Sequence, residues 1–482
     1  MSASQSISSR RVDASPSICF VALGAYPLFD PQVRGPMGGM ETRAWTFART
    51  LARRGARVSF VVADRGQPAV TEFEKITVYA RRDSIATELV KAVRNVAADA
   101  KSLQGSNSGM IRGLFVLAGR ATAHFAGTIG TIARQVVHSV PSGRVLYPRI
   151  PADVFLTFGV NGISAEVVVS CRAQNRKSVV CIAHDSDLDE LFMTPTRRRR
   201  ADGVLAVDGC QALRQTDEIV VQSQHQLELL SERFGRVGHT IANPIDLDTD
   251  DTQGTALEPH VCTLIRKGPY VLWVGRSDPV FKQPEACLAL AEKLPDMRFV
   301  MVLALCDATL HAAIKRKKPA NVEIIDGLPF RSMPHLFRWA LALVSTSRQE
   351  GFPNIFLQAG KYRVPVVSLN VDPDGLFSQQ GVGFVCGGSL ERMADALRHL
   401  AAEPEQRALY ANRLARYVAE NHDLAGRCDE LCEVIDAACG SAEGPAFRLV
   451  HATPSTDRGS ERVTLNAPSL AFRAQPGSRK AV

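Results

Sequence analysis

A carboxylate in a glycine- and proline-rich loop is the most distinctive chemical feature of the chain. Residues 344–369 have the sequence VSTSRQEGFPNIFLQAGKYRVPVVSL, in which an apolar run ends at small polar residues and a helix begins near Asn354 or Ile355. Glu350 lies in the loop between them. Ligands of open α/β sheets bind beyond the carboxyl ends of the strands, where helix N-termini direct amide donors at anions. Glu350 therefore either faces a ligand or only balances the dipole of the following helix.

Two cations follow an earlier apolar run. Residues 271–282 have the sequence VLWVGRSDPVFK, in which Arg276 comes directly after the run and Lys282 lies six residues further on. Two fixed cations at the end of a strand can stabilise a diphosphate, whose negative charge grows as it leaves. Taken alone, however, such a pair is more typical of surface cations near a strand end.

Two segments of the N-terminal half add neutral groups. The segment GGME follows the first expected strand and contains Gly39, which would let the backbone approach a ligand closely, although many loops hold such a pair. His184 ends the apolar run 179–183 and could bind a ligand, although a histidine at a strand end is more often structural. Asp185 and Asp187 form a DxD pattern. We expect Asp187 to cap the following helix, and we expect no metal site.

Taken in chain order, from the GGME segment to the Glu350 loop, the four motifs resemble glycosyltransferase family 4, of the glycosyltransferase group 1 type. The segment SLNVDPDG, which begins at Ser368, is also found in exopolysaccharide-type members. The resemblance covers residues 18–438 and is most specific between residues 270 and 369. It implies a GT-B fold, in which two α/β domains face each other across a cleft, and the transfer of a sugar with retention of anomeric configuration.

The resemblance assigns the loop of Glu350 to the donor sugar. Glu350 would meet the sugar hydroxyls. The backbone groups that would approach sugar and phosphate are those of Gly351, Phe352, Pro353 and Asn354. The family usually places a second Glu against the ribose, and this chain has Gln358 at that position. Because an amide accepts hydrogen bonds less strongly than a carboxylate, this departure puts nucleotide affinity in question more than chemistry.

The resemblance also gives roles to the other motifs. Arg276 and Lys282 would clamp the donor diphosphate, and their position before the Glu350 loop favours this role over that of surface cations. Their spacing is about one residue longer than is usual, and Gln283 replaces a glycine. Gly39 would approach the diphosphate from the opposite domain. His184 would bind the donor sugar or position the acceptor.

The elements that must position these residues alternate between strand and helix. Residues 18–62 form a strand–loop–helix–strand unit, and a second alternation begins at residue 270, which predicts an α/β fold with two doubly wound, Rossmann-like sheets. The expected divisions are a disordered N-terminus (1–17), an acceptor-side domain (18–243), a linker (244–268), a donor-side domain (269–440) whose last helices return to the N-terminal domain, and a disordered tail (441–482).

Composition narrows the possible partners. The chain has 482 residues and a formal net charge of +8. Residues 1–243 hold 30 Lys and Arg against 21 Asp and Glu, so the whole excess lies in the N-terminal half. This asymmetry favours an anionic partner, although solubility alone would also explain it. With 6% aromatic residues and no aromatics interleaved with the basic ones, we expect no nucleic-acid partner.

Residues 109–140 are the most apolar stretch, but basic residues interrupt it before the length of a membrane span. On a helix the basic residues fall on one arc and the large apolar ones opposite, which favours a helix lying on an anionic membrane surface over one packed on its own domain. Four glycines weaken any single long helix here. The basic residues are Arg112, Arg120, His124, Arg134 and His138.

The sequence therefore predicts a cytoplasmic enzyme that could contact the inner face of a membrane peripherally. The polar, serine-rich start lacks the apolar core of a signal peptide, and the 11 cysteines form no disulfide framework or zinc pattern. We expect a hexosyl- or related transferase that uses a UDP- or GDP-sugar as substrate, needs no cofactor, and acts on a saccharide or lipid-linked acceptor. The alternatives are a non-catalytic nucleotide-binding homologue that scaffolds a synthase complex, and a nucleotide-sugar epimerase of the same fold.

Overall fold

Short apolar runs form two sheets, which confirms the expected α/β fold with two parallel-dominated sheets. The computed structural model describes residues 15–440, apart from 31–32, 34–37, 84–87, 90–91, 94–95, 97–99, 101–109, 138–139, 250–258 and 329–331. Both sheets belong to one compact unit of the chain. The tail 441–482, which was expected to be disordered, lies outside the described residues.

The N-terminal lobe is built on the first sheet, whose strand order is β3-β4-β2-β1-β5-β6-β7-β8. Neighbouring strands are parallel except for the pair β3–β4. The strands are β1 (Ile18–Val21), β2 (Val58–Ala63), β3 (Val70–Phe73), β4 (Ile76–Arg81), β5 (Val154–Phe158), β6 (Lys177–Cys181), β7 (Glu218–Val221) and β8 (His239–Thr240).

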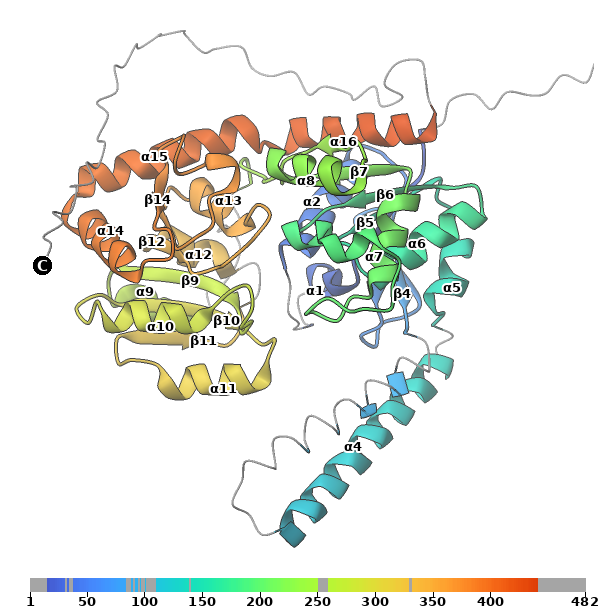
Figure 1. Cartoon of the computed structure of the whole chain (residues 1–482), viewed down its shortest axis with the longest axis horizontal. Helices are drawn as coiled ribbons and strands as arrows, with labels where there is room; N and C mark the ends of the chain where they lie inside the picture. Colours follow the sequence, from blue (N-terminus) through green and yellow to red (C-terminus); the bar gives the residue numbers. More distant parts are fainter. Residues whose placement is uncertain are drawn as a thin grey trace, which may run out of the picture. The chain divides into compact units, whose positions relative to one another are not determined.

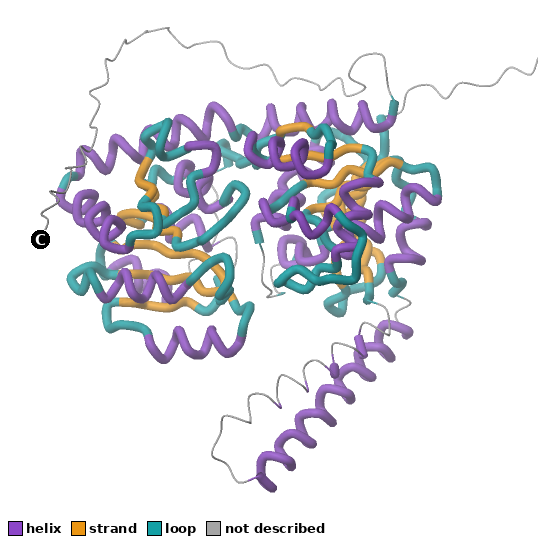
Figure 2. Tube along the Cα trace, in the orientation of Figure 1, coloured by secondary structure: helices purple, strands orange, loops and turns teal. Residues whose placement is uncertain are grey.

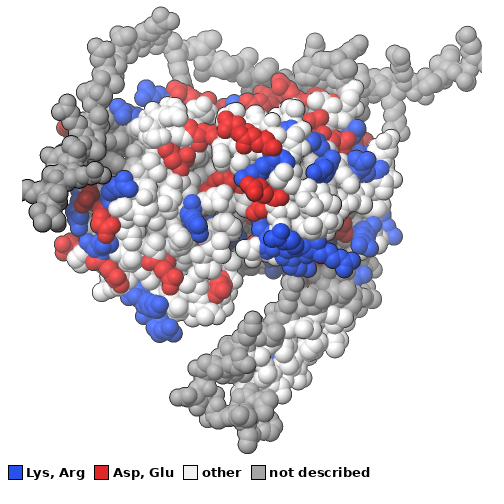
Figure 3. All heavy atoms as spheres, in the orientation of Figure 1, with Lys and Arg blue, Asp and Glu red and all other residues white. Residues whose placement is uncertain are grey.

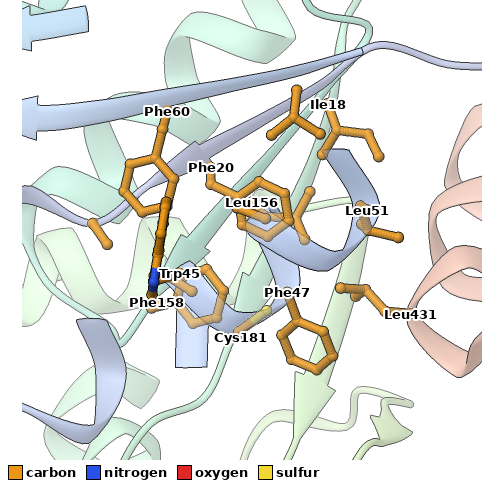
Figure 4. Close-up of a cluster of buried hydrophobic side chains, with 14 of the residues drawn as sticks. Ile18, Phe20, Trp45, Phe47, Leu51, Phe60, Leu156, Phe158, Cys181 and Leu431 are labelled. Carbon is orange, nitrogen blue, oxygen red and sulfur yellow. The ribbon is translucent and has the colours of Figure 1, made fainter. Parts of the chain in front are cut away.

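Helices cover both faces of this sheet, so its central strands are apolar throughout rather than alternating. Ile18 and Phe20 face α1, α2 and α16, in the cluster drawn in Figure 4, whereas Cys19 and Val21 face the opposite layer. The first layer comprises α1 (Tyr26–Phe29), α2 (Gly39–Arg53) and α16 (Leu424–Cys439). The second comprises α5 (Gly143–Leu146), α6 (Gly162–Ala173), α7 (Ala206–Gln215), α8 (Gln224–Phe234) and the short turns η2 (Tyr147–Arg149), η3 (Asp185–Leu188) and η4 (Glu190–Met193).

The C-terminal lobe is built on the second sheet, which is parallel and has the order β11-β10-β9-β12-β13-β14. Its strands are β9 (Tyr270–Arg276), β10 (Phe299–Ala304), β11 (Val322–Ile325), β12 (Ala340–Ser345), β13 (Val366–Ser368) and β14 (Gly383–Val385). One face is covered by α9 (Pro259–Arg266), α12 (Met333–Arg338), α13 (Asn354–Lys361) and α15 (Pro404–Asn421), and the other by α10 (Pro284–Glu292), α11 (Ala308–Lys317) and α14 (Leu390–Ala402). Figure 2 shows this layering of strands between helices.

The chain passes between the lobes twice, near Ile245 and near His422, and these two segments lie side by side. Ile245 N donates to His422 O at 2.9 Å, and His422 Nδ1 donates to Asn243 O at 2.8 Å. Burial disfavours the charged imidazolium and lowers the pKa of His422 to about 4, although the bond to Asn243 opposes this shift. After this junction α16 packs on α2, β5 and β6 of the N-terminal lobe.

Some elements differ from the expectations. Helix α4 (Met110–Val137) is continuous through its glycines, because glycine costs about 1 kcal/mol of helix propensity but keeps its N–H donor. Within the expected linker 244–268, α9 forms because Val261 and Leu264, one helical turn apart, bury themselves in the C-terminal core. The hairpin β3–β4 was not predicted, since Val70 and its neighbours on β3 are largely exposed.

Candidate active site

The candidate residues of the C-terminal lobe follow two neighbouring strands. The strand order changes direction between β9 and β12, and this switch point is where open α/β sheets bind ligands. Strand β9 ends at Arg276, and β12 ends at Ser345. Because parallel strands end at the same edge, the loops that carry Lys282 and Glu350 start side by side.

Hydrogen bonds join these two loops. Arg348 N donates to Phe281 O at 2.8 Å, and Thr346 Oγ1 donates to Lys282 O at 2.8 Å. Trp273 Nε1, from inside β9, donates to Thr346 Oγ1 at 2.9 Å. The buried strand therefore fixes the hydroxyl that holds the backbone of Lys282 beside the Glu350 loop.

Lys282 and Glu350 form an ion pair, with side chains 21% and 12% exposed. Burial alone would raise the pKa of Glu350, but the Lys282 ammonium and hydrogen bonds from Lys282 and Ser347 hold that pKa below its ordinary value. The carboxylate is therefore charged at neutral pH. An anion that binds Lys282 must compete with this internal partner.

Arg276 is more accessible. Its guanidinium donates to Asp278 Oδ2 at 3.3 Å, and its side chain is 44% exposed. Asp278 is held in turn, because its other oxygen accepts from the amides of Val280 and Phe281. Both candidate cations thus lie at one sheet edge, each against a carboxylate of the same lobe.

His184 reaches this edge from the N-terminal lobe. Its Nε2 donates to Gln349 O at 3.0 Å, while its Nδ1 accepts from Ser186 N at 3.1 Å. Because a carbonyl oxygen can only accept, these partners assign the proton to Nε2. The ring also packs edge-on against Phe281, with centroids 4.8 Å apart. The histidine therefore contacts both loops of the opposite lobe.

The peptide groups after Glu350 are held by two glutamines of the N-terminal lobe that belong to none of the sequence motifs. Gln222 Oε1 accepts from Phe352 N at 3.0 Å, and Gln226 binds both Gln222 N and Asp185 Oδ1. A Cβ on Gly351 would lie 2.6 Å from Gln226 Nε2 and 2.7 Å from Gln222 Oε1. Their signal in the sequence was a pair of glutamines, four residues apart, directly after the apolar run of β7.

These contacts change the expected role of the backbone. Phe352 N–H is already engaged and Pro353 has no N–H, so among residues 351–354 the amides left for a ligand are those of Gly351 and Asn354. Phe352 itself is buried against His422, with ring centroids 4.6 Å apart. Asn354 begins α13.

Gly39 meets the same loop. Asn354 Nδ2 donates to Gly39 O at 2.9 Å, and a Cβ on Gly39 would lie 3.1 Å from that nitrogen. Asn243 Nδ2 donates both to Phe352 O, at 3.0 Å, and to Asn354 Oδ1, at 2.8 Å. The glycine therefore permits a close approach between the lobes at the start of α13.

Gln358, the expected ribose contact, is half-buried on α13. The cap expected of Asp187 differs in the structure. Asp187 does not act as the N-cap: it accepts from the amides of Ala183 and His184 instead. His184 and Asp189 cap the two short turns that replace the expected helix, because the chain bends after Leu188.

A pocket of about 190 Å³ opens beside Glu350 and Gly351. The N-terminal lobe contributes Asp185 and His225, and the C-terminal lobe contributes Arg348 and Asp374. Asp374 also accepts from the first two amides of α8, at 2.9 and 3.2 Å. Polar and charged groups of both lobes thus converge next to the Lys282–Glu350 pair.

Known proteins share this architecture. Residues 268–403 match the family model described as Glycosyl transferases group 1. HepE of Anabaena, solved in complex with UDP and glucose, is 14% identical with a TM-score of 0.58, covering 88% of this chain and 100% of that chain. Sucrose-phosphate synthase of Thermosynechococcus elongatus is 14% identical with a TM-score of 0.60, covering 89% and 100%.

A UDP-forming α,α-trehalose-phosphate synthase of Burkholderia vietnamiensis is 13% identical with a TM-score of 0.55, covering 88% of this chain and 100% of that chain. No curated protein matches the chain by sequence. At these identities the solved structures establish the fold alone. The chain therefore has the GT-B fold, and its C-terminal lobe is similar to the glycosyl transferases group 1 family.

Proposed function

We propose that the chain is a retaining glycosyltransferase that moves a sugar from a nucleoside-diphosphate sugar to a saccharide or lipid-linked acceptor, in polysaccharide or glycoconjugate synthesis. The observation that carries the proposal is the Lys282–Glu350 pair, which lies at the switch point of the C-terminal sheet and is faced by His184. These residues are far apart in sequence. The similarity of residues 268–403 to glycosyl transferases group 1 supports the same reaction class.

In the proposed reaction the donor diphosphate takes the place of the internal carboxylate on Lys282. As the bond between the sugar carbon and the diphosphate oxygen breaks, that oxygen keeps the electron pair, and Lys282 and Arg276 stabilise the growing charge. Glu350, released from Lys282, accepts hydrogen bonds from sugar hydroxyls. The acceptor oxygen attacks the same face of the sugar and gives its proton to the departing diphosphate, so configuration is retained.

The neutral groups complete this proposal. His184 Nε2–H would turn from Gln349 O to a sugar hydroxyl, and the free amides of Gly351 and Asn354 would bind the donor's oxygens. Gln358 would bind the ribose hydroxyls. HepE of Anabaena was solved with UDP-glucose, which makes UDP-glucose the first donor to test, before other UDP- and GDP-sugars.

We also propose a cytoplasmic location with peripheral contact to an anionic membrane. All eleven cysteines are free, which supports a reducing compartment. Among the described residues, no helix combines the length and apolar character needed to cross a membrane.

The test is turnover by the purified full chain. Each nucleotide sugar is incubated with and without saccharide and lipid-linked acceptors, and nucleoside diphosphate and sugar products are identified by mass spectrometry. We expect acceptor-stimulated release of the diphosphate and a product with the donor's anomeric configuration by NMR. Binding without release would favour the non-catalytic homologue, and acceptor-independent conversion of the donor to an isomer would favour the epimerase.

A further inference from the structure

Helix α4 exposes apolar side chains between residues 116 and 129. Val116, Phe125 and Ile129 are 40%, 39% and 64% exposed, and between residues 116 and 133 Arg120 is the only Lys, Arg, Asp or Glu. At about 1.5 Å per residue, the 28 residues span about 42 Å. In Figure 1 the helix extends beyond both sheets. Apolar surface of this extent in water marks a binding surface.

The helix is fixed at its C-terminal end. Both terminal nitrogens of Arg134 donate to Asp64, at 2.9 and 2.8 Å, and the Asp64 side chain is 1% exposed. Burial would raise the pKa of Asp64, but the bonds from Arg134 and nearby amides hold it below its ordinary value. Asp64 follows β2, so α4 is fastened at the edge where the parallel strands end. Arg134 was expected on the basic arc that faces a membrane, but this ion pair turns it toward its own lobe. The side chains of Arg112 and His138 lie outside the described residues.

A basic loop is fastened to the same edge. Arg197, Arg198 and Arg199 are exposed on the loop between η4 and α7. The next residue, Arg200, anchors the loop by donating to Ser186 O and Asp202, and Ser186 lies in the turn that His184 begins. Figure 3 shows basic side chains gathered on this part of the N-terminal lobe.

We propose that α4 and the loop of Arg197, Arg198 and Arg199 form one membrane-docking surface, whose occupant is an anionic lipid bilayer. The loop offers charge to lipid phosphates, while Phe125 and Ile129 enter the boundary between headgroups and acyl chains. The helix lies on the bilayer rather than across it. A protein partner would require complementary acidic groups beside an apolar groove, whereas an anionic bilayer supplies both chemistries over the whole length of α4.

Docking would also orient the site. Since α4, the basic loop and His184 all start from the carboxyl edge of the N-terminal sheet, a docked lobe presents this edge to the lipid surface. This orientation rests on the proposed function, because it identifies the acceptor as one delivered from the bilayer. Docking itself depends only on α4 and the loop.

The experiment measures partition of the full chain onto vesicles of phosphatidylcholine, with and without phosphatidylglycerol, by flotation. We expect binding to the anionic vesicles that weakens as salt is added. The apolar variant is Phe125→Ser with Ile129→Ser, and its control is Val237→Ser, at a site 85% exposed elsewhere on the lobe. The basic variant replaces Arg197, Arg198 and Arg199 with Gln, and its control replaces the exposed Lys315, Arg316 and Lys317 of α11 with Gln.

We expect the apolar variant to lower the partition coefficient about tenfold and the basic variant about 100-fold at low salt, with both controls unchanged. Absence of partition, an apolar variant that binds normally, or an equal loss in the α11 control would overturn the proposal. So would a dimer in sedimentation velocity that the apolar variant dissociates, because α4 would then bind a second copy. Diphosphate release without vesicles is measured in parallel. A chain that releases it but does not dock overturns the membrane contact and leaves the proposed transferase reaction standing, and a chain that docks without release overturns only that reaction.

Discussion

The C-terminal lobe meets the candidate site with two cations and Glu350, whereas the N-terminal lobe meets it mainly with an imidazole, amides and a glycine backbone, and adds the carboxylate of Asp185 at the pocket. Lys282, Arg276 and Glu350 belong to the first group, and His184 and Gly39 to the second. Charge is needed where a diphosphate departs, and neutral groups suffice where two lobes must fit closely around a sugar. Under the proposed function, the C-terminal lobe would therefore carry the chemistry and the N-terminal lobe would supply the enclosure.

Removing a charged side chain from the C-terminal lobe is the strongest test of this difference between the lobes. For Lys282→Ala we expect kcat/KM to fall about 1000-fold, because the variant loses a fixed cation and leaves the Glu350 carboxylate buried without its partner. The same variant should raise the pKa of Glu350, so the acid limb of the pH–rate profile should move to higher pH.

Steady-state release of the nucleoside diphosphate measures this effect. Lys293→Ala is the matched control, because Lys293 pairs with Glu391 on the same lobe, at a side chain 40% exposed. An unchanged rate in Lys282→Ala would falsify the assignment of charge to the C-terminal lobe.

A second prediction concerns the junction where the lobes meet. His422 has a folded-state pKa of about 4, below its ordinary value, so between about pH 6.5 and pH 4 the unfolded chain binds a proton that the folded chain does not. The contribution of His422 is therefore complete above this window and is lost as pH falls through it, by about 3 kcal/mol.

Urea denaturation at several pH values measures the loss. In His422→Gln the free energy of unfolding should depend less steeply on pH across this window, whereas His399→Gln, at an exposed position on α14, should keep the wild-type slope. Equal slopes in wild type and His422→Gln would show that His422 does not cause the loss of stability at acid pH.

The charged half of this site could be predicted from the sequence. Lys282 and Glu350 lie in loops that follow apolar runs, and because parallel strands end at one edge these patterns place both loops there. That the two side chains serve one ligand was implied only by the resemblance to a known family. The same patterns predict both sheets, because fully buried parallel strands are short, continuous apolar runs.

Of the neutral half, His184 and Gly39 could be predicted, but their glutamine neighbours could not. Gln222 and Gln226 act only through their position against Gly351, and neither a glutamine nor a glycine signals a partner on another lobe. The loss of Phe352 N–H as a ligand donor could not be predicted for the same reason, since it depends on Gln222, which is distant in sequence.

The smallest expected effect tests the fit of the enclosure. In Gly351→Ala the new methyl would meet the ends of Gln226 and Gln222 at 2.6 and 2.7 Å, and since such overpacking costs about 1–3 kcal/mol we expect kcat/KM to fall about tenfold. Gly39→Ala meets Asn354 at 3.1 Å and should cost less. Because the crowding atoms are side-chain ends, adding Gln226→Ala to Gly351→Ala should recover part of the loss. If the second substitution only deepens it, Gln226 contributes through its bond to Asp185 rather than through its fit, and the N-terminal lobe supplies more than an enclosure.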